Sequence, residues 1–412
     1  MGGWSTDRQG GLQGDFCHIR LHGIPGRGPG RRALEGRAPL SQGAGETGLT
    51  DSVERFELAL AHKEPDRVPI DYWAAPEITR RLIDHFGLSC REELLQHLDV
   101  DFRYISGPEY TGPKLQSAED GSWRVDHWGV KRLRMELPSG GTYWEVKDFP
   151  LAAAGSVEEI RDYPGWPSPD WFDYECVRTQ VAEARATGKV VVFMGDRMNR
   201  CAQLKPAMYL RGIEQILMDF VLNPGIAECI FSRTVEFYLE YARRTFEAAG
   251  PGGMDVFMTG DDFGTQNGEI VSPGMWREFL APGFREFIRL GKKYGFHVAH
   301  HSCGSIKSII PDMIDCGLDI LNPLQPDVRD MDRRVLKRLF GENLSFHGSI
   351  SIQKTLPFGT PDQVRSEVKE RFETLGPHGG FIFCTAHNIQ ADTPLENITT
   401  LFDSYRDFGR YG

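Results

Sequence analysis

The feature that most constrains this fold is a repeating order of short apolar runs and long amphipathic helices. The runs are too continuous to be half-exposed, so each is predicted to be a strand buried in a parallel sheet. Eight candidates occur, and eight is the number of a closed barrel. We therefore expect the α/β class and a (β/α)8 TIM barrel. The runs are Val68–Trp73, Phe102–Ile105, Val190–Met194, Val256–Thr259, Phe296–Ala299, Leu318–Leu321, Leu344–Phe346 and Phe381–Phe383.

Two segments stand apart from this pattern. Residues 1–50 are rich in glycine and arginine and lack apolar periodicity, so we predict a disordered N-terminal extension. The barrel is expected to occupy residues 51–412. Within it, residues 123–148 alternate in polarity and contain Gly140-Gly141, which predicts an inserted antiparallel hairpin.

Helix starts are marked by a capping residue followed by proline. This pair occurs at Asn223-Pro224, Ser272-Pro273, Thr360-Pro361 and Thr393-Pro394. Thr360 with Gln363, and Thr393 with Glu396, have the spacing of a capping box. Asp51 with Glu54 has the same spacing and predicts the first helix of the barrel.

Composition excludes several classes of partner. The formal net charge of -11 disfavours nucleic acid and anionic membranes, because no basic stripe is left to neutralise phosphates. No apolar run reaches the roughly 18 residues that a membrane span needs. The 8 cysteines have no disulfide-framework spacing, so we expect free thiols in a reducing compartment, the cytoplasm. A homodimer is left open.

Polar residues cluster where the predicted strands end, which is where barrel enzymes place their chemistry. Chance would not put so many potential ligands and donors at successive strand ends. We take them as the candidate site: Arg197, Asp261, Asp262, Gln266, His301, Cys303, Asn322, Gln325, His347, Cys384, His387, Asn388 and Gln390.

The sharpest motif is His301-Ser302-Cys303-Gly304. Alternate residues at a strand end can aim an imidazole and a thiolate to one side, and this pair suits zinc. A catalytic zinc site normally has three protein ligands, and the third is expected from the last strand, as either Cys384 or His387. The competing interpretation is that the cysteines are small buried residues and the histidines only hydrogen-bond their neighbours.

Two further predictions have structural alternatives. One of the adjacent carboxylates Asp261 and Asp262 is expected to face the pocket as a catalytic group and the other to cap a loop, in an order the sequence leaves open. Arg197 is expected either to clamp a substrate carboxylate or to pair with a carboxylate at the barrel mouth.

These residues resemble the uroporphyrinogen decarboxylase superfamily, which includes cobalamin-dependent methyltransferases. The matching landmarks are Glu54-Arg55-Phe56 through Asp66-Arg67-Val68-Pro69, the His301–Gly304 turn, and the segment from Ala386 to Asn397. The resemblance covers about residues 52–410 and implies a TIM barrel.

The decarboxylase branch carries an arginine-rich R-Q-A-G-R motif that binds porphyrinogen carboxylates. The corresponding stretch here, residues 69–76, has no arginine, which disfavours that branch, although His387 resembles its histidine before threonine-proline. The methyltransferase branch carries zinc on an H-x-C turn plus a cysteine near the last strand. His301 and Cys303 fit that pattern, whereas His387 stands at the expected cysteine position and Cys384 lies three residues earlier.

The resemblance implies a zinc-dependent methyltransferase that moves a methyl group between a small-molecule donor or acceptor and a corrinoid (cobalamin). The D-x-H-x-x-G signature of corrinoid carriers is not found, so we expect a separate corrinoid protein to supply the cofactor. His387 is then either a ligand or a catalytic group, and Gln266, Asn322, Gln325, His347, Asn388 and Gln390 are expected to shape the substrate pocket. The alternatives are a decarboxylase of the porphyrin-biosynthesis type and a catalytically idle binding protein.

Overall fold

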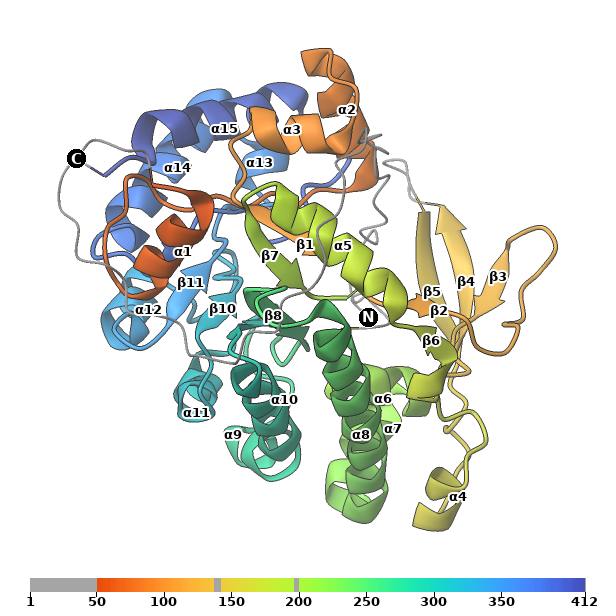
Figure 1. Cartoon of the computed structure of the whole chain (residues 1–412). Coiled ribbons are helices and arrows are strands. Elements are labelled where there is room, and N and C mark those ends of the chain that lie inside the picture. The colour runs from red at the N-terminus through yellow and green to blue at the C-terminus, as the bar shows by residue number, and fades with distance from the viewer. Residues whose placement is uncertain (1–49, 137–141, 196–199, 412) are drawn as a thin grey trace, which may run out of the picture.

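A curled parallel sheet of seven strands forms the centre of the protein (Figure 1). The computed structural model describes residues 50–136, 142–195 and 200–411. Residues 1–49 of the predicted N-terminal extension, and Arg197, lie outside these ranges. The strands follow the order β1 (Phe102–Ile105), β7 (Val190–Phe193), β8 (Val256–Gly260), β9 (His297–His301), β10 (Ile320–Asn322), β11 (Ser345–His347) and β12 (Phe381–Ile382).

The predicted closed barrel of eight strands is observed in part. Seven of the eight apolar runs form the sheet, but Val68–Trp73 forms no strand. This segment instead makes an isolated parallel bridge from Ile70 to Phe383 beside β12. On its other side, the backbone N–H of Asp101, just before β1, donates to the carbonyl of Ile70 at 2.9 Å. The segment thus lies between the two ends of the sheet without a continuous ladder to either.

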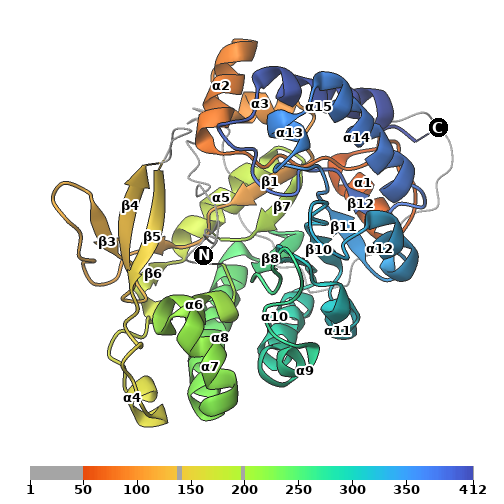
Figure 2. The same cartoon turned by 180° about the vertical axis from the view of Figure 1, so that it is seen from behind.

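Helices surround the sheet (Figures 1 and 2). The longest, Pro224–Ala249, lies between two successive parallel strands, where a crossover connection is needed. The helices are α1 (Ser52–Leu60), α2 (Pro76–Phe86), α3 (Arg91–His97), α4 (Val157–Arg161), α5 (Glu175–Ala186), α6 (Leu204–Arg211), α7 (Ile213–Leu222), α8 (Pro224–Ala249), α9 (Pro273–Met275), α10 (Ala281–Lys293), α11 (Ile310–Asp315), α12 (Arg333–Phe340), α13 (Thr355–Phe358), α14 (Pro361–Leu375) and α15 (Leu395–Phe408).

Three of the four predicted cap–proline pairs mark a helix start, although the Asn223 side chain makes no cap hydrogen bond at α8. Thr360 and Gln363 form a reciprocal capping box at α14, and the Asp51 side chain accepts from the N–H of Glu54 at α1. At α15 the predicted box of Thr393 with Glu396 does not form. The helix begins at Leu395, and Pro394 occupies the cap position without a side-chain hydrogen bond. Thr393 is therefore one residue too early to cap this helix.

Alternation along the strands divides the core into two layers. Val191 and Phe193 pack with the residues of the surrounding helices. Val190 and Val192 point the other way and join an inner cluster with Phe56 and residues of β8, β9, β10 and β12. The interior of the sheet is therefore filled by side chains, and a site can form only at its ends.

An antiparallel sheet of three short strands occupies the region of the predicted hairpin. Its strands are β3 (Trp123–Val125), β4 (Lys131–Glu136) and β5 (Thr142–Asp148). The turn at residues 137–141 lies outside the described ranges. Both views place this sheet at one side of the molecule, away from α12 and α14 (Figures 1 and 2). A second small pairing joins β2 (Glu109–Tyr110) to β6 (Phe172–Asp173).

Within the described ranges, the cysteines are free thiols. No helix in those ranges combines the length and the apolar character that crossing a bilayer would demand.

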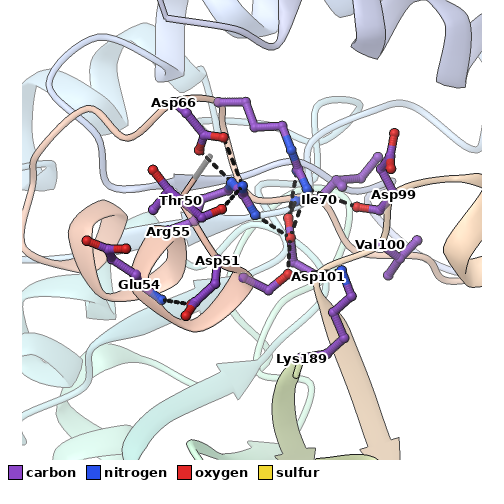
Figure 3. A network of polar contacts seen from close by, with 12 residues as sticks. Thr50, Asp51, Glu54, Arg55, Asp66, Ile70, Asp99, Val100, Asp101 and Lys189 are labelled. Atoms are coloured by element: carbon purple, nitrogen blue, oxygen red, sulfur yellow. Dashed lines mark hydrogen bonds and ion pairs between the residues drawn. The ribbon is translucent and has the colours of Figure 1, made fainter. Parts of the chain in front are cut away.

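A buried ionic network lies at the end of the sheet where β1 and β7 begin (Figure 3). Asp101, which is fully buried, accepts from Arg55 Nη1 at 2.8 Å, Arg67 Nη1 at 2.7 Å and Ser52 Oγ at 2.7 Å. Arg55 also pairs with Asp66. This end of a barrel lies opposite the strand ends that carry catalytic residues, so a charge network here serves stability. Arg55, Asp66 and Arg67, part of the motif that carried the resemblance, therefore hold the fold together.

We expect Asp101→Ala to lower the free energy of unfolding by about 3–5 kcal/mol, because it removes the buried carboxylate that the buried Arg55 and the half-buried Arg67 share. Urea denaturation measures this change. Asp403→Ala is the matched control, since Asp403 pairs with Arg406 on the surface, and it should change the free energy by no more than about 0.5 kcal/mol. Equal effects of the two substitutions would contradict the assignment.

Candidate metal centre

Three potential ligands converge where the strands end. His301 is the last residue of β9, Cys303 follows two residues later, and His387 comes from the loop after β12. Their ligand atoms all lie within 4.8 Å of one another. Gly304 permits the turn that brings Cys303 back, because its φ is +89° and a Cβ there would lie 2.3 Å from the carbonyl carbon of Gly264.

The spacing and exposure of these side chains suit a catalytic zinc ion. In a tetrahedral site, zinc bonds to nitrogen and sulfur place the two ligand atoms roughly 3.5 Å apart. The distance from His301 Nε2 to Cys303 Sγ is 3.4 Å. His301 is buried, whereas Cys303 and His387 are half-buried, so one side of the group remains accessible. That arrangement leaves room for a substrate atom as a fourth ligand.

A chain of hydrogen bonds behind His301 fixes which of its nitrogens is available. The amide of Asn322 is oriented by its Nδ2, which donates to the carbonyl of His347 at 3.2 Å and to His347 Nδ1 at 2.5 Å. Its Oδ1 must then accept from His301 Nδ1, at 2.5 Å. His301 therefore carries its proton on Nδ1, and the lone pair of Nε2 faces Cys303. Burial lowers the pKa of His301 well below its ordinary value and keeps the ring neutral.

The same chain continues to a buried carboxylate. Because His347 Nδ1 accepts from Asn322, its Nε2 carries the proton and donates to Asp71 Oδ2 at 3.0 Å. Tyr104 and Trp73 donate to the same oxygen, at 2.5 Å and 3.0 Å. Asp71 thus accepts the first of a series of hydrogen bonds that runs through His347 and Asn322 to His301. This series leaves Nε2 of His301 unprotonated.

His387 is held differently. Its Nδ1 accepts from the backbone N–H of Asn388 at 2.7 Å, so in this arrangement its proton is on Nε2. Binding a metal at Nε2 requires the opposite tautomer and the loss of the Asn388 hydrogen bond. His301 and Cys303 are therefore the preorganised pair, and His387 must rearrange to complete a set of three ligands.

Cys384 lies in a different group from His301 and Cys303. It clusters with Asp71 and His347, all three of them buried. Burial raises the pKa of its thiol well above the ordinary value, which opposes the thiolate that a metal needs. Of the two candidates for the third ligand, the geometry thus brings His387 to the site.

The adjacent carboxylates have separate tasks. Asp261 accepts from the backbone N–H groups of Gln203, Leu204 and Lys205 at 2.6–2.8 Å and so caps α6. Burial raises its pKa to about 6 despite these bonds. Both of its oxygens are occupied, so the structure leaves it a cap rather than the predicted catalytic group.

Asp262 is the carboxylate that faces the site. Its Oδ1 accepts from the N–H of Cys303 at 2.9 Å and lies 3.7 Å from His301 Nε2. Lys205 pairs with its other oxygen at 2.5 Å. Burial alone would raise the pKa of Asp262, but the Lys205 ammonium holds it below its usual range.

The remaining predicted site residues contact the loops around the candidate ligands rather than the ligand atoms themselves. Gln325 Oε1 accepts from the N–H of Gly304 at 2.9 Å and so supports the turn. Asn388 contacts His387 through its backbone, and Gln390 Nε2 donates to the Asn388 carbonyl at 2.9 Å. Gln266 is joined to Arg329 by its backbone carbonyl.

A pocket that sequence reasoning missed adjoins His301. Its polar lining includes Arg132 from β4, together with Arg200 and Lys205. Residues 69–76 provide no arginine, as noted above, and the cations of this pocket come from other segments. Asp71 was missed as well. A lone acid inside the apolar run Val68–Trp73 was the available signal for it, whereas no sequence pattern links Arg132 to a site some 170 residues away.

An α/β fold with imidazole and thiol donors at its strand ends defines a barrel-like protein with a candidate metal centre. The sequence profile of the uroporphyrinogen decarboxylase (URO-D) family matches residues 198–408, just over half of the chain. The chain therefore belongs to the URO-D family.

Individual relatives include proteins of both branches. A methylcobamide:CoM methyltransferase of Methanosarcina barkeri is 27% identical over 173 residues, which cover 42% of this chain and 47% of that protein. A uroporphyrinogen decarboxylase of Azoarcus sp. (strain BH72) is 30% identical over 198 residues, covering 46% and 49%. The matched segments thus span about half the length of these curated relatives.

A solved structure supports the fold over a longer region. The structure of a methyltransferase from Methanosarcina mazei aligns with 87% of this chain and 99% of its own, at a TM-score of 0.59 and 19% sequence identity.

Proposed function

We propose that this chain is a zinc-dependent methyltransferase of the cytoplasm, which moves a methyl group between a small molecule and the corrinoid of a separate protein. The observation that carries the proposal is the donor set His301, Cys303 and His387 at the accessible ends of the strands. The methylcobamide:CoM methyltransferase relative supports the reaction class.

The protein's own residues would each have a defined task. His301 and Cys303 hold the ion, and His387 completes the set. Asp262 fixes the Cys303 backbone, and Lys205 offsets the charge of that carboxylate. When bound, zinc supplies a Lewis acid that lowers the pKa of an acceptor thiol or polarises the heteroatom bearing the methyl group.

The test is methyl transfer by the full-length, zinc-loaded protein, with free methylcobalamin in place of the corrinoid protein. We expect methylcobalamin to lose its methyl group in the presence of a thiol, which the change in corrinoid absorbance measures. Chelation of the metal should abolish this activity. The proposal would be contradicted if the zinc-loaded protein transferred no methyl group from methylcobalamin to any of a panel of thiols, amines and phenols.

Decarboxylation is the second candidate, and the 30% identical decarboxylase relative together with the cationic pocket favours it. The same preparation should then convert uroporphyrinogen without a metal. Activity that survives chelation would identify this reaction.

A further inference from the structure

The pocket beside His301 has several cationic side chains in its lining. Among the residues that the structure describes, its charged lining residues are Arg132, Arg200 and Lys205. The other walls are aromatic or apolar and include Trp128, Tyr209 and Tyr238. A cavity with cations at its polar positions and apolar walls fits a short organic anion better than a neutral or cationic molecule.

Arg132 is held rigidly in this wall. It is 2% exposed, its Nε donates to Asp126 Oδ2 at 2.8 Å, and its guanidinium lies 4.7 Å from the centre of the Tyr209 ring. The other oxygen of Asp126 accepts from the backbone N–H groups of Trp128 and Val130. The three-stranded sheet is therefore built so that Arg132 reaches the pocket in one orientation.

One end of this guanidinium lacks an acceptor. Arg132 Nη2 is buried and has no hydrogen-bond partner among the residues that the structure describes. Buried donors are normally satisfied, so such a group in a pocket indicates where a ligand binds. A carboxylate or sulfonate oxygen would complete it with a charge-assisted bond.

The other two cations of the pocket are Arg200 and Lys205. A Cβ on Gly260 would lie 2.4 Å from Arg200 Cδ, so the glycine at the end of β8 makes room for this side chain. Lys205 lies between the pocket and the metal centre, because it lines the former and pairs with Asp262 in the latter. The cationic wall and the candidate ligands thus belong to one continuous surface that includes His301.

We propose that this pocket binds the carboxylate or sulfonate end of the small substrate, with Arg132 as its specificity-determining contact. The heteroatom at the other end of the same molecule then reaches the metal centre. The position of that heteroatom rests on the proposed methyltransferase function, whereas anion binding does not.

Isothermal titration of the zinc-loaded protein with two matched thiols tests the proposal. 3-Mercaptopropionate carries the anion, and 3-mercapto-1-propanol replaces it with a neutral hydroxyl. We expect the anion to bind at least tenfold more tightly, and Arg132→Gln to remove most of this preference. Arg134→Gln is the control, because Arg134 lies on the same strand but is exposed and pairs with Glu136. Equal affinities for the two thiols, or a preference that Arg132→Gln leaves intact, would overturn the inference.

Two further measurements separate the causes of failure. Arg200→Gln leaves the ion pair between Arg132 and Asp126 in place and should also reduce the preference for the anionic thiol. This variant replaces Arg132→Gln if the latter does not fold. Propionate should also bind to the metal-free protein in a way that depends on Arg132, and ligand-observed NMR measures this binding. This binding would persist even if the methyltransferase proposal failed, and its absence in the folded wild-type protein would count against the anion site.

Discussion

Replacing Cys303 with alanine is expected to leave the purified protein without stoichiometric zinc and to abolish methyl transfer. In the proposed site Cys303 would supply the anionic ligand, and its Sγ lies 3.4 Å from the preorganised nitrogen of His301. Without it, two neutral imidazoles remain, one of which must first change its tautomer, and such a pair falls short of the usual three ligands. Elemental analysis of wild type and variant measures the result, with about one zinc per chain expected for wild type.

Cys384→Ala is the matched control for this experiment. The sequence also predicted Cys384 as a possible metal ligand, but this thiol clusters with Asp71 and His347 instead. We expect this variant to retain zinc at the wild-type level. If Cys384→Ala lost the metal while Cys303→Ala retained it, the site would have to be rebuilt around the buried cluster.

Sequence periodicity was sufficient to locate the strands and the polar residues that follow them. Buried parallel strands need continuous apolar runs, and seven of the predicted runs became strands. The remaining run, Val68–Trp73, meets the ends of the sheet through isolated bonds. Whether an apolar segment completes a ladder depends on the geometry of its two neighbours, which no local pattern encodes.

The roles of individual site residues were harder to predict. Asp261 and Asp262 are adjacent and chemically identical, and only the fold shows that α6 begins beside one of them. Asp71 and Arg132 reach the site from segments far from the His301–Gly304 turn. Their tasks follow from tertiary contacts, since a buried carboxylate or guanidinium acquires its role from its partners.

Substituting Asn322 with leucine should weaken zinc binding by about 10–100-fold while leaving all three ligands in place. Asn322 Oδ1 accepts a hydrogen bond from His301 Nδ1, and the Asn322 amide is itself oriented by His347. Leucine has a similar volume but cannot accept, so the Nδ1–H tautomer loses its support and Nε2 no longer has to present a lone pair. Competition with a zinc-binding chromophore at fixed pH measures the affinity.

Asn397→Leu separates this effect from a general loss of stability. Asn397 is also a buried asparagine, and its Nδ2 donates to the carbonyls of Leu356 and Gly359, away from the metal centre. Both variants should lower the free energy of unfolding, since each leaves buried groups unpaired. Only Asn322→Leu should change the zinc affinity of the folded protein. Equal zinc affinities of the two variants would mean that the hydrogen-bond chain from Asp71 to His301 serves packing alone.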